Sequence, residues 1–188
     1  VALTDEVKST SATAIQELKA LGIETYMLTG DNAQTAAVVA NEVGIDHYVA
    51  QTLPADKANF VKQLQAEGKK VAMVGDGIND SAALAVADLS VAMGRGSDIA
   101  IDTAMLTLLT SDLLRLPQAI RLSARTVRTI RQNLFWAFFY NIVSVPIAAG
   151  ALYPICGFML SPMIAGAAMA LSSVSVVTNS LRSGLKRI

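Results

Sequence analysis

The first part of the chain alternates short apolar runs with longer segments that have helical periodicity. Residues 71–74 form an apolar run of the length of a buried strand and end at Gly75-Asp76-Gly77, where glycine permits a tight turn. Asn79 and Asp80 then open a segment rich in alanine and leucine, as helix caps and acidic first-turn residues do. Strands that alternate with helices predict a parallel sheet with right-handed crossovers. Further strands are predicted at residues 24–28, 48–49, 89–92 and 105–109, and further helices at residues 4–21, 33–43, 55–67 and 98–103.

The rest of the chain contains two long uncharged segments. No charged residue occurs between Arg131 and Arg182. Residues 134–152 would form a helix of about 28 Å, close to the thickness of a bilayer core, and residues 159–181 form a second such segment. The basic residues on either side of the two segments favour a transmembrane hairpin with both ends in the cytoplasm over a buried hydrophobic hairpin of a soluble protein. The flanking basic residues are Arg121, Arg125, Arg128, Arg131, Arg182, Lys186 and Arg187.

Composition excludes some classes of function. Among 188 residues, 15 lysines and arginines balance 15 aspartates and glutamates, so nothing in the overall charge indicates nucleic acid binding. The single cysteine, Cys156, excludes an internal disulfide and a metal site made of several cysteines within this chain. The first residues show no signal-peptide pattern and resemble the end of a strand, so we expect the chain to begin inside a domain.

Polar residues follow three of the predicted strands. They lie in Thr29-Gly30-Asp31-Asn32, in the helix start that includes Lys57, and in residues 76–80. Parallel sheets bind ligands at the carboxyl ends of their strands, where Thr29 could donate to a phosphoryl oxygen and Lys57 could neutralise its charge. The oxygen donors around Asp76 suit Mg²⁺. Each residue alone has an ordinary explanation, as a helix cap or a solvated lysine, and only their combination indicates a phosphoryl site.

These three motifs resemble the second half of the phosphorylation domain of P-type ATPases, which belongs to the haloacid dehalogenase-like superfamily. The resemblance implies an α/β fold, a partial haloacid dehalogenase-like (Rossmannoid) parallel sheet, followed by the two-helix transmembrane hairpin. It also implies that Asp76 and Asp80 bind Mg²⁺ and that Thr29, Gly30, Asp31 and Lys57 contact ATP or its phosphoryl group. The catalytic residues implied in this way are Thr29, Gly30, Asp31, Lys57, Asn79 and Asp80.

Two signatures of the family do not occur in this chain. The phosphorylated aspartate of P-type ATPases lies in an Asp-Lys-Thr-Gly sequence, and dephosphorylation uses a Thr-Gly-Glu loop; neither sequence occurs here. A recognisable nucleotide-binding domain is also missing. Covalent catalysis requires its nucleophile, so we expect this chain alone neither to form an aspartyl phosphate nor to pump.

The two apolar segments resemble the last two membrane helices of copper(I)-transporting ATPases. Spacing alone favours ordinary packing roles for the serines and methionine there. The resemblance, carried by Tyr140-Asn141 and by Met169-Ala170-Leu171-Ser172-Ser173, implies instead that Tyr140, Asn141, Met169 and Ser173 help to bind Cu⁺ or Ag⁺. A thioether is a soft ligand that suits these ions. The expected Cys-Pro-Cys partner would lie on an earlier helix, which this chain does not include.

The sequence therefore predicts part of an ATP-driven Cu⁺ (or Ag⁺) export pump in the bacterial plasma membrane, with its phosphorylation domain in the cytoplasm. Expected partners are membrane lipid, the missing actuator, nucleotide-binding and Cys-Pro-Cys parts, and a copper chaperone, with no nucleic acid. Two alternatives remain open: a membrane-anchored phosphatase of the haloacid dehalogenase type, and an inactive truncated product or subunit of a split pump. The predicted division is residues 1–115, the phosphorylation domain; 116–132, a basic connecting helix; 133–153, a membrane helix; 154–158, an extracytoplasmic turn; 159–181, a membrane helix; and 182–188, a cytoplasmic tail.

Overall fold

The computed structural model describes residues 7–76, 78–94, 102, 104–149 and 162–185. The chain divides into two compact units, Val1–Gln118 and Ala119–Ile188. Two predictions fall wholly or partly outside the described residues: the first three residues of the helix predicted at residues 4–21, and the extracytoplasmic turn predicted at residues 154–158. The short helix predicted near residues 98–103 is also outside them, except for Asp102, which is helical.

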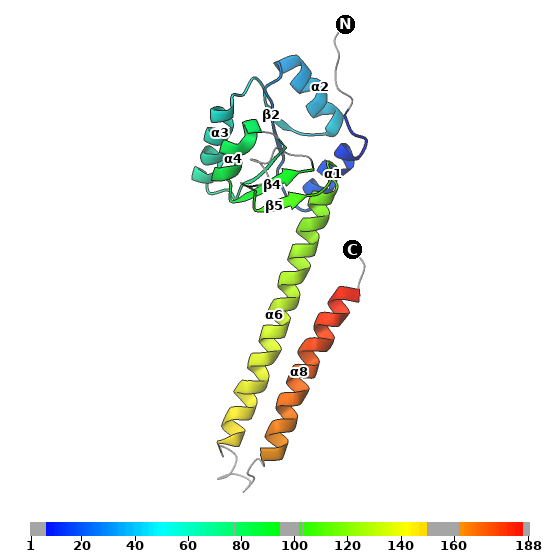
Figure 1. Ribbon diagram of the computed structural model, residues 1–188, viewed down its shortest axis with the longest axis vertical. Coiled ribbons are helices and arrows are strands. Elements are labelled where there is room, and N and C mark those ends of the chain that lie inside the picture. The colour runs from blue at the N-terminus through cyan, green and yellow to red at the C-terminus, as the bar shows by residue number, and fades with distance from the viewer. Residues whose placement is uncertain (1–6, 77, 95–101, 103, 150–161, 186–188) are drawn as a thin grey trace. The chain divides into compact units, whose positions relative to one another are not determined.

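The first unit alternates helices and strands as the sequence predicts (Figure 1). Local signals set several ends: Asn32 caps helix α2 by accepting a hydrogen bond from the Thr35 backbone N–H at 2.9 Å, and Gly44 ends it at φ 77°. Proline at the first position begins helix α3. The elements are α1 (Thr10–Ala20), β1 (Tyr26–Leu28), α2 (Ala33–Val43), β2 (His47–Val49), α3 (Pro54–Ala66), β3 (Ala72–Gly75), the short 3₁₀ helix η1 (Ile78–Asp80), α4 (Ser81–Val86), β4 (Leu89–Met93) and β5 (Leu106–Leu108).

The strands form two parallel sheets instead of the single sheet that the sequence predicts. Strand β1 pairs with β2, with Met27 opposite Tyr48. The second sheet has the order β3-β4-β5, with Val74 opposite Val91. Among the described residues no strand joins β1 to β3, so each of them lies at the edge of its own sheet. The parallel arrangement itself is confirmed, and it places the carboxyl ends of the paired strands at a common edge of each sheet.

The core of the first unit lies between two helices and strand β3. Helix α3 contributes Ala58 and Val61, helix α4 contributes Ala83 and Leu84, and β3 contributes Met73. Leu84 and Val61 are almost completely buried, at 1% and 2% exposure. Packing of α3 against α4 therefore fixes the start of α3 relative to the turn that precedes α4.

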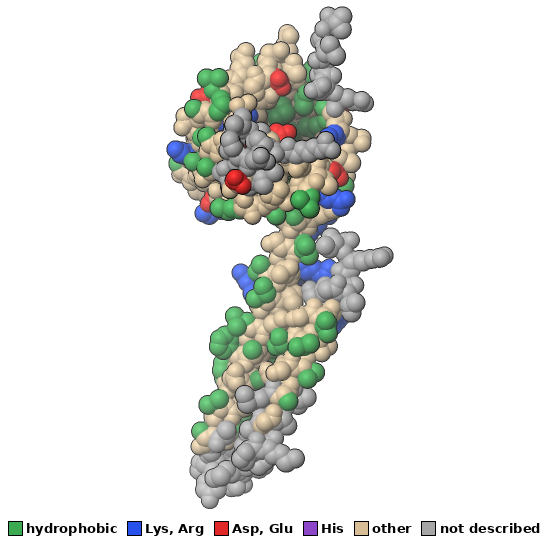
Figure 2. All heavy atoms as spheres, viewed as in Figure 1, with side chains coloured by type: hydrophobic (Ala, Val, Ile, Leu, Met, Phe, Trp, Pro, Cys, Tyr) green, Lys and Arg blue, Asp and Glu red, His purple; other side chains and the backbone are tan. Residues whose placement is uncertain are grey.

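The second unit consists of parts of two long helices, α6 (Arg115–Ala148) and α8 (Pro162–Leu185). Helix α6 begins within the first unit, where Leu116 and Pro117 are buried. It runs without a break through the predicted boundary between residues 132 and 133 and contains Pro146. Large hydrophobic side chains of this unit are exposed, and Figure 2 shows them along its surface.

A helix that could span a membrane needs enough length together with enough apolar character. None of the helices meets both requirements over the residues that the structure describes. The transmembrane hairpin and the predicted division of the chain stay predictions.

Candidate functional site

The loop after β1 is closed by hydrogen bonds among its own residues. The Thr29 hydroxyl donates to Oδ2 of Asp31 at 2.7 Å and also accepts from the Asp31 backbone N–H at 3.1 Å. Gly30 is exposed between them. The threonine hydroxyl and the aspartate are therefore held together at the carboxyl end of β1, as the sequence motif predicts.

The loop after β2 is joined to the loop after β1. Thr52 donates from both its hydroxyl (2.9 Å) and its backbone N–H (3.0 Å) to the Thr29 carbonyl. The Gln51 N–H donates to the Asp31 carbonyl at 2.9 Å, with Gln51 in the left-handed region at φ 56°. Sequence reasoning did not identify Thr52 or Gln51, and a threonine two residues before a helix-starting proline carries no distinctive signal.

Lys57 and Asp80 form an ion pair that links the start of α3 to the turn after β3. Their atoms Nζ and Oδ1 are 2.8 Å apart, and each side chain is only 14% exposed. Asp80 occupies the cap position of α4 but makes no side-chain cap bond. The predicted position of Asp80 at the start of this helix is confirmed, but its carboxylate is held by Lys57 and makes no cap bond.

Gly75 brings the end of β3 close to Asp80. A Cβ atom added to Gly75 would lie 2.7 Å from Cβ and 2.8 Å from Oδ2 of Asp80. Only glycine permits this approach without a shift of η1. The carboxylate of Asp80 thus lies against the end of β3, on the turn that also contains Asp76 and Asn79.

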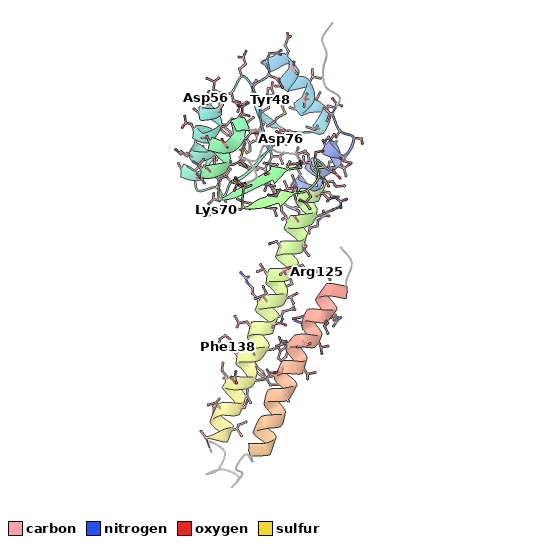
Figure 3. All side chains as sticks on the ribbon, in the orientation of Figure 1. Tyr48, Asp56, Lys70, Asp76, Arg125 and Phe138 are labelled. Atoms are coloured by element: carbon pink, nitrogen blue, oxygen red, sulfur yellow. The ribbon has the colours of Figure 1, made fainter. Side chains whose placement is uncertain are left out.

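Asp76 and Asn79 are exposed on this turn. Asp76 makes no hydrogen bond or ion pair with the described residues, whereas Asp80 is held by Lys57. Figure 3 shows Asp76 at the opposite end of β3 from Lys70, as their positions on either side of Ala72–Gly75 require. The carboxylate of Asp76 is available to a ligand, and a lysine and a threonine lie on the neighbouring loops.

Ion pairs lie at the amino ends of the strands, and their residues join neighbouring elements to one another. Hydrogen bonds from Lys70, the Val71 N–H and Gln65 hold the pKa of the Asp88 carboxyl below its ordinary value. The Lys69 ammonium donates to Oε2 of Glu24 at 2.8 Å and lowers the pKa of that carboxyl. These groups precede β1, β3 and β4, so they lie away from the edge that carries Thr29, Lys57 and Asp76.

Comparison with known proteins identifies the family. Residues 1–88 match the haloacid dehalogenase-like hydrolase family. The copper-exporting P-type ATPase of Vibrio cholerae is 54% identical over 182 residues, which are 97% of this chain and 20% of that protein. The copper-exporting P-type ATPase of Staphylococcus saprophyticus is 56% identical over 100% of this chain and 22% of its own length. The chain belongs to the P-type ATPase family.

A solved P-type ATPase structure agrees with the fold of this chain. It is a zinc-transporting PIB-type ATPase in the E2.Pi state, with a TM-score of 0.83 and 39% sequence identity, covering 97% of this chain and 29% of that one. This chain spans 20% and 22% of the length of the two curated P-type ATPases described above. It is thus similar to a limited part of each relative.

The donor set at the end of β3 fits the Mg²⁺ that the resemblance to P-type ATPases implies. Asp76 offers an exposed carboxylate and Asn79 an exposed amide, and both are the hard oxygen donors that Mg²⁺ takes. The described residues contain no group of three or more His, Cys, Asp or Glu side chains that could hold a metal. Mg²⁺ usually retains several waters and binds substrate phosphate oxygens in addition to its protein ligands.

The four residues implied in Cu⁺ binding lie on α6 and α8. Tyr140 is half-buried, and Asn141 is exposed and donates to the Ala137 carbonyl of its own helix at 3.0 Å. Ser173 is exposed on α8, and the side chain of Met169 lies outside the part that the structure describes. Their joint role in metal binding stays a prediction.

Proposed function

We propose that this chain is part of an ATP-driven pump that exports Cu⁺ or Ag⁺, and that its first unit holds the phosphoryl group during transfer. The observation that carries the proposal is the joining of three strand-end loops at one place. Thr52 ties the loops after β1 and β2, and the Lys57–Asp80 ion pair ties α3 to the turn after β3. Membership of the P-type ATPase family supports the same reaction class.

Each residue in these loops has a role that its contacts support. The Thr29 hydroxyl and the exposed backbone of Gly30 would donate hydrogen bonds to phosphoryl oxygens, with Asp31 holding the threonine in place. Lys57 would place one positive charge beside those oxygens, oriented by Asp80. When bound, Mg²⁺ would neutralise developing negative charge on the phosphoryl group. Asp76 and Asn79 would hold the ion, together with the oxygen of Asp80 that Lys57 does not engage.

The covalent step requires an aspartate that this chain does not contain. Its carboxylate oxygen would form a bond to the γ-phosphorus of ATP while the bond from that phosphorus to the β-γ bridging oxygen breaks and ADP leaves. The unpaired edges of β1 and β3 support a position for this aspartate at the end of a strand between them. Lys69 bonds both Glu24 and Tyr26, which keeps the amino ends of β1 and β3 close although the described strands do not pair. A parallel strand between them would end beside Thr29 and Asp76.

Three features support a monovalent soft metal as the transported ion. The curated relatives described above are named for copper export. Residues 132–181 contain no charged side chain and no histidine, whereas a Zn²⁺ pump would be expected to place a charged group there. Met169 offers a thioether, and Tyr140, Asn141 and Ser173 offer oxygen and nitrogen atoms. These four residues would form the part of the transport site that this chain contributes.

We propose further that α6 and α8 form a membrane hairpin in the bacterial plasma membrane, with the first unit in the cytoplasm. The exposed large hydrophobic side chains of the second unit support contact with lipid. The arginines before residue 132 and after residue 181 support an orientation with both ends on the cytoplasmic side. Residues 116–132 would then connect the phosphoryl site to the transport site.

Substitution of Asp76 in the intact protein tests the phosphoryl site. Asp76→Asn should reduce the aspartyl phosphate formed from radiolabelled ATP by more than about 100-fold, because a ligand of the essential cation is lost. Asp46→Asn is the matched control, since Asp46 is an exposed carboxylate that precedes β2 and pairs with Lys19. Full phosphorylation of the Asp76 variant would refute this role.

Metal dependence tests the transported ion and the rival phosphatase function. Cu⁺ should stimulate ATP hydrolysis by the intact protein, and Zn²⁺ should not. Met169→Ala should weaken the stimulation by Cu⁺ and spare phosphorylation from inorganic phosphate, because the substitution removes only a metal ligand. An ATP turnover that no monovalent soft metal changes would favour a membrane-anchored phosphatase, and unchanged Cu⁺ dependence in the methionine variant would refute its ligand role.

A further inference from the structure

A cluster of three polar side chains joins α6 to α8 within the second unit. Asn133 donates from Nδ2 to Oγ of Ser180 at 2.8 Å, and its Oδ1 accepts from Nδ2 of Asn179 at 2.7 Å. We call these three residues the asparagine clasp. Asn133 and Asn179 are half-buried, in a unit whose exposed surface is rich in apolar side chains. Both hydrogen bonds of the clasp join side chains of α6 to side chains of α8.

Half-buried positions continue along both helices from the clasp. They recur at alternating steps of four and three residues, which is the spacing of two helices packed lengthwise against each other. On α6 they are Asn133, Ala137, Tyr140, Ser144 and Ile147, and on α8 they are Ser172, Val176 and Asn179. Asn133 and Asn179 of the clasp therefore lie on the half-buried face of their helices, and their hydrogen bond determines which half-buried positions of α6 and α8 are level with each other.

The register that the clasp sets brings two of the four implied metal ligands, Tyr140 and Ser173, to one level. Tyr140 is seven residues after Asn133 on α6, and Ser173 is seven residues before Ser180 on α8. Seven residues are about two turns, or about 10.5 Å, and return to nearly the same face of a helix. Because the helices run in opposite directions, as Figure 1 shows, both residues lie two turns from the clasp toward the same end of the hairpin.

We propose that Asn133 is a positioning residue for the metal site. Its single amide donates to Ser180 and accepts from Asn179, the residue before it on α8, and these two bonds restrain α8 from sliding along or rotating against α6. Loss of these hydrogen bonds would let α6 shift along α8, so that Tyr140 and Ser173 are no longer level, although both ligands remain. This inference rests on the proposed transport of a soft metal through these helices.

The first readout is the affinity of the intact protein for Cu⁺, measured by competition with a chromogenic Cu⁺ chelator. Asn133→Leu should weaken binding by about tenfold, because loss of a group that orients metal ligands typically costs at least about tenfold in metal affinity. The control is Gln132→Leu, which removes a neighbouring amide that is exposed and lies off the half-buried face. The double variant Asn133→Ser, Ser180→Asn swaps the two residues and so keeps a hydroxyl opposite an amide. It should bind Cu⁺ with an affinity within about threefold of the unaltered protein.

The second readout reports the register of the helices and needs no copper. In the full chain with Cys156→Ser, the pair Ala137→Cys and Val176→Cys is in register, and the pair Ala137→Cys and Ser172→Cys is one turn out of register. The in-register pair should form a disulfide faster, and Asn133→Leu should remove this preference while Gln132→Leu keeps it.

The two readouts together decide the proposal. Loss of the register preference together with weaker Cu⁺ binding in Asn133→Leu supports it. A change in only one of them, or in neither, overturns it, and so does an equal effect of Gln132→Leu. If the unaltered intact protein binds no Cu⁺, the proposed transport function fails, and the crosslinking still shows whether Asn133 sets the register.

Discussion

Replacement of Gly75 by alanine is a sensitive test of the geometry around the proposed phosphoryl site. The added Cβ would lie 2.7 Å from Cβ of Asp80, whereas ordinary contacts begin at 3.4 Å. The two atoms must therefore separate by at least about 0.7 Å. The Cβ of Asp80 is attached directly to the backbone, so η1 itself has to move.

This movement also affects the ion pair. Nζ of Lys57 and Oδ1 of Asp80 are 2.8 Å apart, and the same displacement would lengthen this distance to about 3.5 Å, the outer limit of a hydrogen bond. Overpacking of a well-packed site costs about 1–3 kcal/mol, and the weakened ion pair places Gly75→Ala in the upper half of that range. We expect a loss of about 2–3 kcal/mol in the local opening free energy of β3 and α4.

Hydrogen exchange measured by mass spectrometry on peptides from β3 and α4 gives this free energy directly. Gly30→Ala is the matched control, because a Cβ at Gly30 would meet only the Thr52 carbonyl oxygen at an ordinary 3.8 Å. That variant should change exchange by less than about 0.5 kcal/mol. Equal exchange in Gly75→Ala and the unaltered protein, or an equal loss in both variants, would refute the close approach of β3 to Asp80.

Three further predictions concern the first unit. Leu84→Ala should reduce the free energy of unfolding by about 2.7–5 kcal/mol, because Leu84 is only 1% exposed. The control Leu53→Ala, at 67% exposure, should change it by less than about 0.5 kcal/mol. Chemical denaturation followed by circular dichroism measures both values. Asp88→Asn should lower the free energy of unfolding most at pH values above 3.8, the ordinary pKa of the carboxyl. Because the pKa of Asp88 is lowered in the folded protein, its stabilisation is lost as the pH falls and the folded carboxyl protonates, so the two proteins should become more similar in stability. A difference in unfolding free energy that stays constant down to about pH 3 would contradict this. A double-mutant cycle of Lys57→Met and Asp80→Asn should give a coupling of about 1.5–3 kcal/mol in local exchange, and additive effects would show that the ion pair contributes nothing.

Local signals in the sequence were sufficient to predict most helix ends of the first unit. Asn32 and Gly44 bound α2 through a cap bond and a left-handed backbone, and both depend only on nearby residues. The ends of a strand were harder to predict, because they depend on pairing with another strand that is distant in the sequence. The strand predicted at residues 48–49 begins one residue earlier, at His47, which stacks on Tyr26 with ring centroids 4.9 Å apart because β2 pairs with β1.

The contacts that tie the candidate site together could not be predicted from local sequence. Lys57 and Asp80 are 23 residues apart, and their pairing depends on how α3 packs against α4. A lysine in the first turn of a helix and an aspartate before another helix each had an ordinary local explanation. The motif predicts which residues belong to the site, and only tertiary packing shows that the carboxylate of Asp80 is engaged by Lys57.

The start of α6 has a practical consequence for building hybrid pumps. Leu116 and Pro117 are buried with the residues before them, and the first unit extends to Gln118. A chimaera that exchanges α6 and α8 between relatives at the boundary between residues 115 and 116 would pack Leu116 and Pro117 of one relative against the core of another. A junction after Gln118 leaves them with their native neighbours, so differences in metal preference between such chimaeras would report the exchanged helices alone.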